Sequence, residues 1–75
     1  MNIKDVKLYM NKTVYYDTGQ INIDGCSIKD FVLTACILRK DKNNRFYYQA
    51  ELKDSGCKNS VLIVELEKVK TIPKI

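Results

Sequence analysis

Residues 46–53 read Phe46-Tyr-Tyr-Gln-Ala-Glu-Leu-Lys53, and this stretch decides how the rest of the chain is interpreted. Apolar side chains occupy every second position along it, in the order Phe46, Tyr48, Ala50 and Leu52. A period of two is that of a β-strand, whose side chains point alternately to the two faces of a sheet. The pattern therefore predicts a strand over 46–53, with Tyr48 in the core and Tyr47 on the surface.

The apolar run Phe31–Leu38 precedes this strand and is compatible with two structures. One is a buried helix, because Asp30 would cap its first turn and the basic pair at 39–40 would suit its C-terminal dipole. The other is a central strand, which is favoured by the β-branched residues of the run, Val32, Thr34 and Ile37. We therefore expect a strand over Val32–Arg39, joined to the next strand by the polar loop 40–45.

Further strands are expected on both sides of this hairpin. Thr13–Tyr16 and Val61–Glu65 are rich in β-branched and aromatic residues. A short last strand is expected near Val69, after one tight turn at Leu66–Lys68. Pro73 then ends any further pairing, because proline lacks the N–H that a ladder needs.

Two local signals complete the order of elements. Asp24-Gly25 suits a two-residue type I′ turn, in which both central residues take positive φ. That turn would bring four apolar residues to one face: Ile21, Ile23, Cys26 and Ile28. We therefore expect a long hairpin-like excursion after the first strand. At the N-terminus, the spacing of Ile3, Val6 and Met10 predicts one helical turn.

The resulting layout resembles that of small SH3-like β-barrel proteins, many of which are carried by phages and mobile elements of low-GC bacteria. The resemblance rests on four segments: Lys12–Tyr16, Leu33–Arg39, Phe46–Leu52 and Val61–Val69. It implies a mainly β fold, a small five-stranded antiparallel SH3-like barrel made by one domain over residues 1–75. The acidic and aromatic signature with which eukaryotic SH3 domains bind proline-rich peptides is not evident, so that activity is not carried over.

Length and composition favour one small globular domain. The chain has 75 residues, of which 45% are hydrophobic, and its formal net charge is +4. A domain of this size buries only about 60–65% of the surface that its unfolded chain exposes, so we expect marginal stability and count a homo-oligomer among the alternatives. No apolar run is long enough to cross a membrane and no secretory signal is apparent, so we expect a cytoplasmic protein without membrane contact.

The residue types present offer little for catalysis. Histidine, the side chain that most readily exchanges protons near neutral pH, is absent. The three cysteines, Cys26, Cys36 and Cys57, lack the paired spacing of a zinc site, and we expect free thiols, with burial raising the pKa of Cys36. Residues 17–25 miss the ligand spacing of a calcium loop. We therefore expect a protein that is not an enzyme, with no catalytic residue, no cofactor and no metal.

Two carboxylates, Glu51 and Asp54, remain as an alternative acid–base pair if they share a cleft. The interpretation we favour is an outward glutamate on a solvated sheet face and an aspartate that begins a turn.

Positive charge is concentrated in the loop between the two central strands, where Arg39, Lys40, Lys42 and Arg45 outnumber Asp41. Exposed tyrosines beside arginine are favoured at protein interfaces. A basic loop with aromatic flanks can also lie along phosphates and stack bases. The candidate binding residues are Arg39, Lys40, Lys42, Arg45, Tyr47 and Gln49.

We expect a non-enzymatic binding module that uses this hairpin. The resemblance implies a phage or mobile-element accessory protein that binds and modulates or inhibits a host protein, a defence protein among the candidates. A nucleic-acid-binding domain using the basic hairpin 39–45 is the first alternative. A small-molecule-binding or sequestering oligomer is the second.

Overall fold

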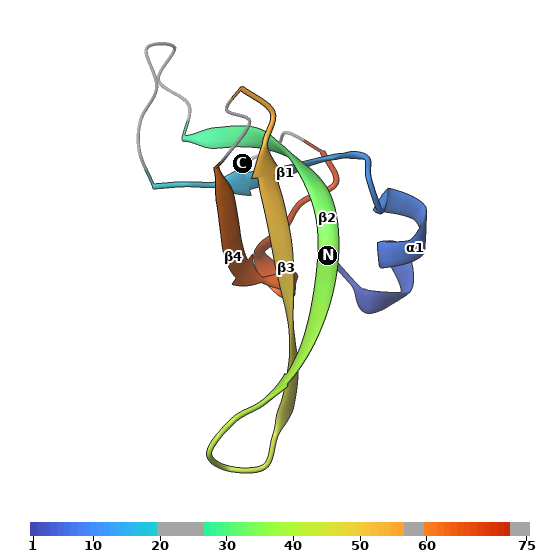
Figure 1. Cartoon of the computed structure of the whole chain (residues 1–75), viewed down its shortest axis with the longest axis vertical. Helices are drawn as coiled ribbons and strands as arrows, with labels where there is room; N and C mark the ends of the chain where they lie inside the picture. Colours follow the sequence, from blue (N-terminus) through green and yellow to red (C-terminus); the bar gives the residue numbers. More distant parts are fainter. Residues whose placement is uncertain (20–26, 57–59, 73–75) are drawn as a thin grey trace.

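The structure, a computed structural model, describes residues 1–19, 27–56 and 60–72. These residues form one four-stranded antiparallel sheet, in which neighbours along the chain are neighbours in space (Figure 1). In chain order, the elements are the 3-10 turn η1 Ile3–Asp5, the helix α1 Val6–Tyr9, the strands β1 Thr13–Asp17, β2 Ile28–Lys40, β3 Phe46–Asp54 and β4 Val61–Glu65, and the 3-10 turn η2 Leu66–Lys68.

The central hairpin decides between the two interpretations of the run 31–38 in favour of a strand. β2 and β3 pair antiparallel, with Leu33 opposite Leu52 and Cys36 opposite Ala50. The register shifts by one residue between these pairs, because Thr34 is an extra residue in β2. Its hydroxyl donates a 3.1 Å hydrogen bond to the Glu51 carbonyl oxygen. Such a bulge strengthens the local twist, and β2 is strongly curved (Figure 1).

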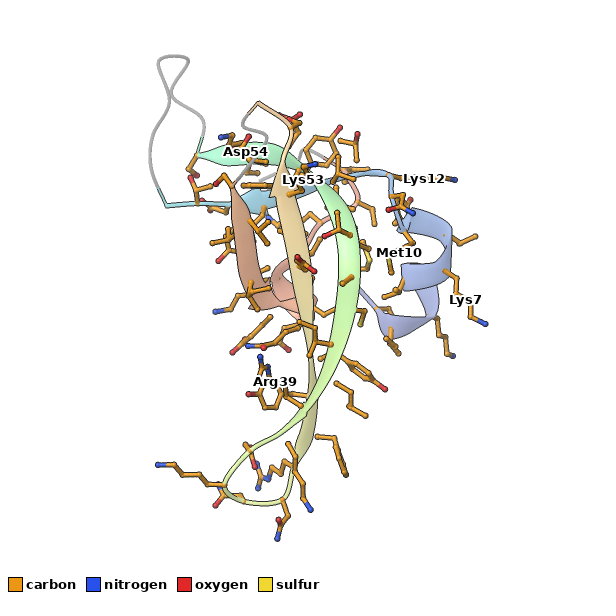
Figure 2. The ribbon with its side chains drawn as sticks, viewed as in Figure 1. Lys7, Met10, Lys12, Arg39, Lys53 and Asp54 are labelled. Atoms are coloured by element: carbon orange, nitrogen blue, oxygen red, sulfur yellow. The ribbon has the colours of Figure 1, made fainter. Side chains whose placement is uncertain are left out.

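The core lies on one face of the sheet, near the end of the hairpin where β1 and β4 join it. Leu33 and Leu52 are fully buried at its centre. Val6 of α1 packs into the same cluster, and Met10 lies between α1 and the sheet (Figure 2). The other buried members are Val14, Phe31, Ala50, Val64, Leu66 and Val69. The short N-terminal helix and η2 thus cover the apolar face that the sheet would otherwise expose.

The core ends at Ala50, and this corrects one prediction. Phe46 and Tyr48 share the face of Ala50 and Leu52, as the alternation indicates, but Phe46 is 67% exposed and Tyr48 39% exposed. The prediction that Tyr48 lies in the core is therefore wrong. The distal part of the hairpin extends beyond the covering elements, so the molecule is elongated, with extents of 41 × 24 × 23 Å (Figure 1).

The C-terminal part follows the expected order of elements in a reduced form. The tight turn at 66–68 is present as η2. The strand expected near Val69 is a single bridge, in which Tyr15 and Lys70 exchange two backbone hydrogen bonds of 2.8 Å. The described sheet therefore has four strands rather than five and is open. The expected turn at Asp24-Gly25 lies outside the described residues.

Candidate functional site

The loop at the distal end of the β2–β3 hairpin is fixed by its own hydrogen bonds. One oxygen of the Asp41 carboxylate accepts from the N–H of Asn43 at 2.8 Å and from the N–H of Arg45 at 3.0 Å. The Asp41 N–H donates to the Arg45 carbonyl oxygen at 2.9 Å. Asn44 has φ of 61°, a left-handed conformation that asparagine tolerates better than most residues. The aspartate that lowers the charge of the loop therefore also holds its shape.

The six candidate binding residues all lie on the projecting part of the hairpin, but not on one face. Arg39 is directly opposite Tyr47, and its Nε donates a hydrogen bond to Oε1 of Gln49. These three residues form one cluster. Its member Arg39 lies on the part of the hairpin that projects away from α1 and β4 (Figure 2). Lys40 belongs to the opposite face, where its Nζ lies 5.6 Å from the centre of the Phe46 ring. Lys42 and Arg45 are exposed in or beside the loop.

A groove of about 690 Å³ runs beside this hairpin. One wall is the N-terminal half of β3, and the other is formed by the end of β4, η2 and the first residues of the chain. It is lined by Met1, Ile3, Asp41, Arg45, Phe46, Tyr47, Tyr48, Gln49, Glu65, Leu66 and Glu67. Three of the predicted residues thus line it: Arg45, Tyr47 and Gln49.

The groove differs in charge from the hairpin that borders it. Its lining includes three carboxylates, from Asp41, Glu65 and Glu67, one guanidinium, from Arg45, and Met1, whose terminal ammonium is near enough to Glu67 to interact with it. Glu65 lies 3.8 Å from the Lys68 Nζ, and both side chains are largely exposed. The surface therefore combines a basic rim, three aromatic rings and an acidic wall.

Sequence reasoning missed the acidic wall. Glu65 reaches the groove because β4 pairs with β3 so that Glu65 is opposite Gln49. Glu67 follows in η2, whose position depends on the packing of Leu66 in the core. Knowing the register of β3 with β4 would have placed Glu65 opposite Gln49. The sequence of the loop between the two strands does not determine that register.

The acid–base alternative does not gain support from the described geometry. Glu51 and Asp54 are three positions apart in β3, so their side chains point to opposite faces of the sheet. Asp54 accepts a 2.5 Å hydrogen bond from the Lys29 ammonium. That bond, together with a second from the Gly56 N–H, holds the pKa of the Asp54 carboxyl below its usual value. Asp54 therefore joins β3 to β2 as an ion pair.

Cys36 is half-buried beside the core, and burial raises the pKa of its thiol. The direction agrees with the prediction from the sequence, and it leaves the thiol protonated near neutral pH. Cys26 and Cys57 lie outside the described residues. Within residues 1–19, 27–56 and 60–72, no three potential metal ligands come together, and no helix is long and apolar enough to span a membrane.

Comparison with protein-family models, with curated proteins and with solved structures finds no match for this chain.

Proposed function

We propose that this protein is a non-enzymatic module that binds a protein partner through the distal part of the β2–β3 hairpin. The contact surface, called the hairpin-tip surface here, consists of Arg39, Lys40, Lys42, Arg45, Tyr47 and Gln49. We further propose that the open sheet is a variant of the SH3-like barrel. If the resemblance to phage-borne barrels holds, the partner is a host protein, a defence protein among the candidates.

The composition of the surface supports a protein partner. Arginine and tyrosine, together with tryptophan, are enriched among the residues that dominate binding energies at protein interfaces. Here Arg39 and Tyr47 lie opposite each other across the hairpin, and Gln49 accepts the Arg39 N–H, which holds the guanidinium in one orientation. A side chain that is already ordered loses less conformational entropy when it binds.

The acidic wall of the groove, formed by Glu65 and Glu67, is the observation that supports a protein partner over the nucleic-acid alternative. Glu65 and Glu67 line the wall of the groove that faces the hairpin, and Asp41 lies in the hairpin loop itself. Carboxylates repel phosphates, whereas a protein surface can offer charges of both signs. The basic loop by itself remains compatible with nucleic acid, so the experiment tests both partners.

Photo-crosslinking at position 47 tests the proposal. The full chain carrying the substitution Tyr47→p-benzoylphenylalanine is irradiated in a nuclease-treated lysate of its native host. We expect a defined protein adduct. The charge reversals Arg39→Glu and Arg45→Glu, introduced together into this chain, should abolish the adduct while the circular dichroism spectrum stays unchanged.

A matched control is available on the other side of the molecule. Lys7 and Lys12 are exposed at α1 and just before β1 (Figure 2), so Lys7→Glu with Lys12→Glu makes the same change in net charge. The adduct should survive this pair of substitutions. Equal loss in both pairs would reject the hairpin-tip surface. Direct binding of labelled DNA or RNA, with a salt slope of nearly one unit per phosphate contact, would favour the nucleic-acid alternative instead.

A further inference from the structure

The outer edge of β4 is a second surface on which another strand could pair. β4 is the last strand of the sheet order, and within the described part of the chain nothing pairs with its free side. Val61 is 52% exposed and Ile63 44% exposed. Folded proteins commonly protect such an edge with charged side chains, proline, a bulge or a very short strand. The five-residue strand Val61-Leu-Ile-Val-Glu65 contains no lysine, proline or bulge, and its one charged residue, Glu65, is at its end.

The hydrogen bonds to β3 determine which backbone groups face outward. The Asp54 N–H donates to the Ser60 carbonyl oxygen at 3.0 Å, so these two residues form a hydrogen-bonded pair. Hydrogen-bonded pairs recur at every second position in an antiparallel ladder. Leu62 and Val64 therefore direct their N–H and C=O groups toward β3. Val61, Ile63 and Glu65 direct theirs to the free edge.

We propose that this edge pairs antiparallel with the same edge of a second copy of the chain, which makes one continuous sheet across a two-fold axis. With Ile63 on the axis, Ile63 pairs with Ile63 of the second copy and Val61 pairs with Glu65. All outward backbone groups of both strands are then hydrogen-bonded. Moving the axis by one residue, to Leu62 or Val64, leaves part of each edge without a partner in β4, and moving it by two, to Glu65, would also place two carboxylates opposite each other.

Charge and side-chain pattern support a second copy as the occupant. Val61 pairs with Lys53 of β3 on one side. In the proposed register it pairs with Glu65 of the second copy on the other side, so Val61 lies between the two charged residues. Ile63 would meet its own counterpart, and apolar β-branched pairs stabilise adjacent strands. The edge is thus complementary to itself in hydrogen bonding and in apolar contact, and the opposite charges of Lys53 and the second copy's Glu65 lie on the same face two strand spacings apart, about 10 Å between backbones.

Analytical ultracentrifugation of the full chain over a range of concentrations tests the proposal. We expect a reversible monomer–dimer equilibrium. Ile63→Lys places two ammonium groups opposite each other and should raise the dimer dissociation constant by at least about tenfold. The matched control is Leu8→Lys, the same kind of change at a residue of α1 that is 63% exposed, and it should leave the dissociation constant unchanged.

Amide hydrogen exchange identifies the edge itself. When the concentration rises through the dimerisation range, exchange at Val61, Ile63 and Glu65 should slow. Exchange at Leu62 and Val64, which are already bonded to β3, should change much less. A chain that stays monomeric at every concentration overturns the proposal. So does a dimer that survives Ile63→Lys, or one that protects the hairpin tip rather than the outward amides of β4. The hairpin-tip substitutions Arg39→Glu and Arg45→Glu should leave the dimer intact, which separates this result from that for the proposed function.

Discussion

Asp54 shows how one side chain ties two strands together. Its carboxylate accepts from the Lys29 ammonium and from the Gly56 N–H, and both bonds favour the charged form. The pKa of Asp54 is therefore lower in the folded chain than its ordinary value of 3.8. A group of this kind stabilises the fold above its unfolded pKa, and that contribution disappears as the pH falls through the folded pKa.

The first prediction concerns this acid dependence. The thermal midpoint of the wild-type chain should fall when the pH is lowered below about 4, because protonated Asp54 no longer pairs with Lys29. Asp54→Asn should have a lower midpoint at neutral pH and a shallower loss in acid, since it has no carboxylate to protonate. Calorimetric scans between about pH 2 and pH 7 measure both. Parallel profiles for the two chains would show that the ion pair does not couple to stability.

At the residue scale, alternation predicted the direction of side chains better than their burial. Ala50 and Leu52 are fully buried as expected, whereas Tyr48 on the same face is exposed. The period of two indicates which side chains share a face, but burial also requires something to cover that face. The covering residues come from α1 and η2, which are distant in sequence, so the length of the core along β3 could not be predicted from the strand alone.

At the scale of elements, the central hairpin consists of two parts with different roles. On the core side of the pair Ile37–Gln49 the residues of the hairpin support or contact the core. Residues 38–48, beyond this pair, carry every member of the hairpin-tip surface except Gln49. Because Ile37 and Gln49 lie directly opposite each other, a two-residue turn can join them.

The second prediction follows from this division. Replacing residues 38–48 by Asn-Gly should leave the rest of the sheet folded, because the removed segment contributes none of the fully buried side chains. The shortened chain should keep the amide chemical shifts of β1 and β4 and should no longer bind the partner that the full chain captures, as a pull-down with that partner would show. Global unfolding of the shortened chain would instead show that the distal hairpin is required for the core.

The strands themselves could be predicted because each has a local signature, and the irregularities between them could not. Val61–Glu65 and the turn at 66–68 occur where the pattern places them. The bulge at Thr34 could not be recognised from the sequence. Nearly every residue of the run 31–38 is apolar, so the run shows no alternation of polar and apolar residues that an extra residue would interrupt. Within residues 60–72 the strand expected near Val69 is one bridge, between Lys70 and Tyr15.

At the scale of the whole molecule, the core and the elements packed around it form a body, and residues 38–48 of the hairpin form an exposed arm. This division determines where substitutions affect stability. Leu33 and Leu38 lie on the same strand, but Leu33 is fully buried and Leu38 is 56% exposed. The body also holds the first residue in place, because the Met1 amine donates to the carbonyl oxygens of Leu66 and Val69.

The third prediction uses these two leucines as a matched pair. Leu33→Ala should lower the free energy of unfolding by about 2–5 kcal/mol, because it leaves a cavity in the core. Leu38→Ala should change it by no more than about 0.5 kcal/mol. Urea unfolding measures both. If Leu33→Ala fails to fold, Leu33→Met, which keeps most of the volume, should cost less than about 1.5 kcal/mol. Similar losses at both positions would contradict the division into body and arm.

The candidate groove is the part of the molecule that depends most on the whole fold. Its basic and aromatic residues are consecutive in sequence and could be predicted, whereas Glu65, Glu67 and Ile3 reach it only through the packing of η2 and the N-terminal segment. No local pattern carries that information.

The extra residue at Thr34 has an evolutionary consequence. Every side chain of β2 beyond it points to the face opposite to the one that uninterrupted pairing would give, and this is why Arg39 shares a face with Gln49. The loss of one codon at this position would exchange the two faces of the strand's distal half in one event, so a single deletion would change which side chains each face of the hairpin presents without any substitution beyond it.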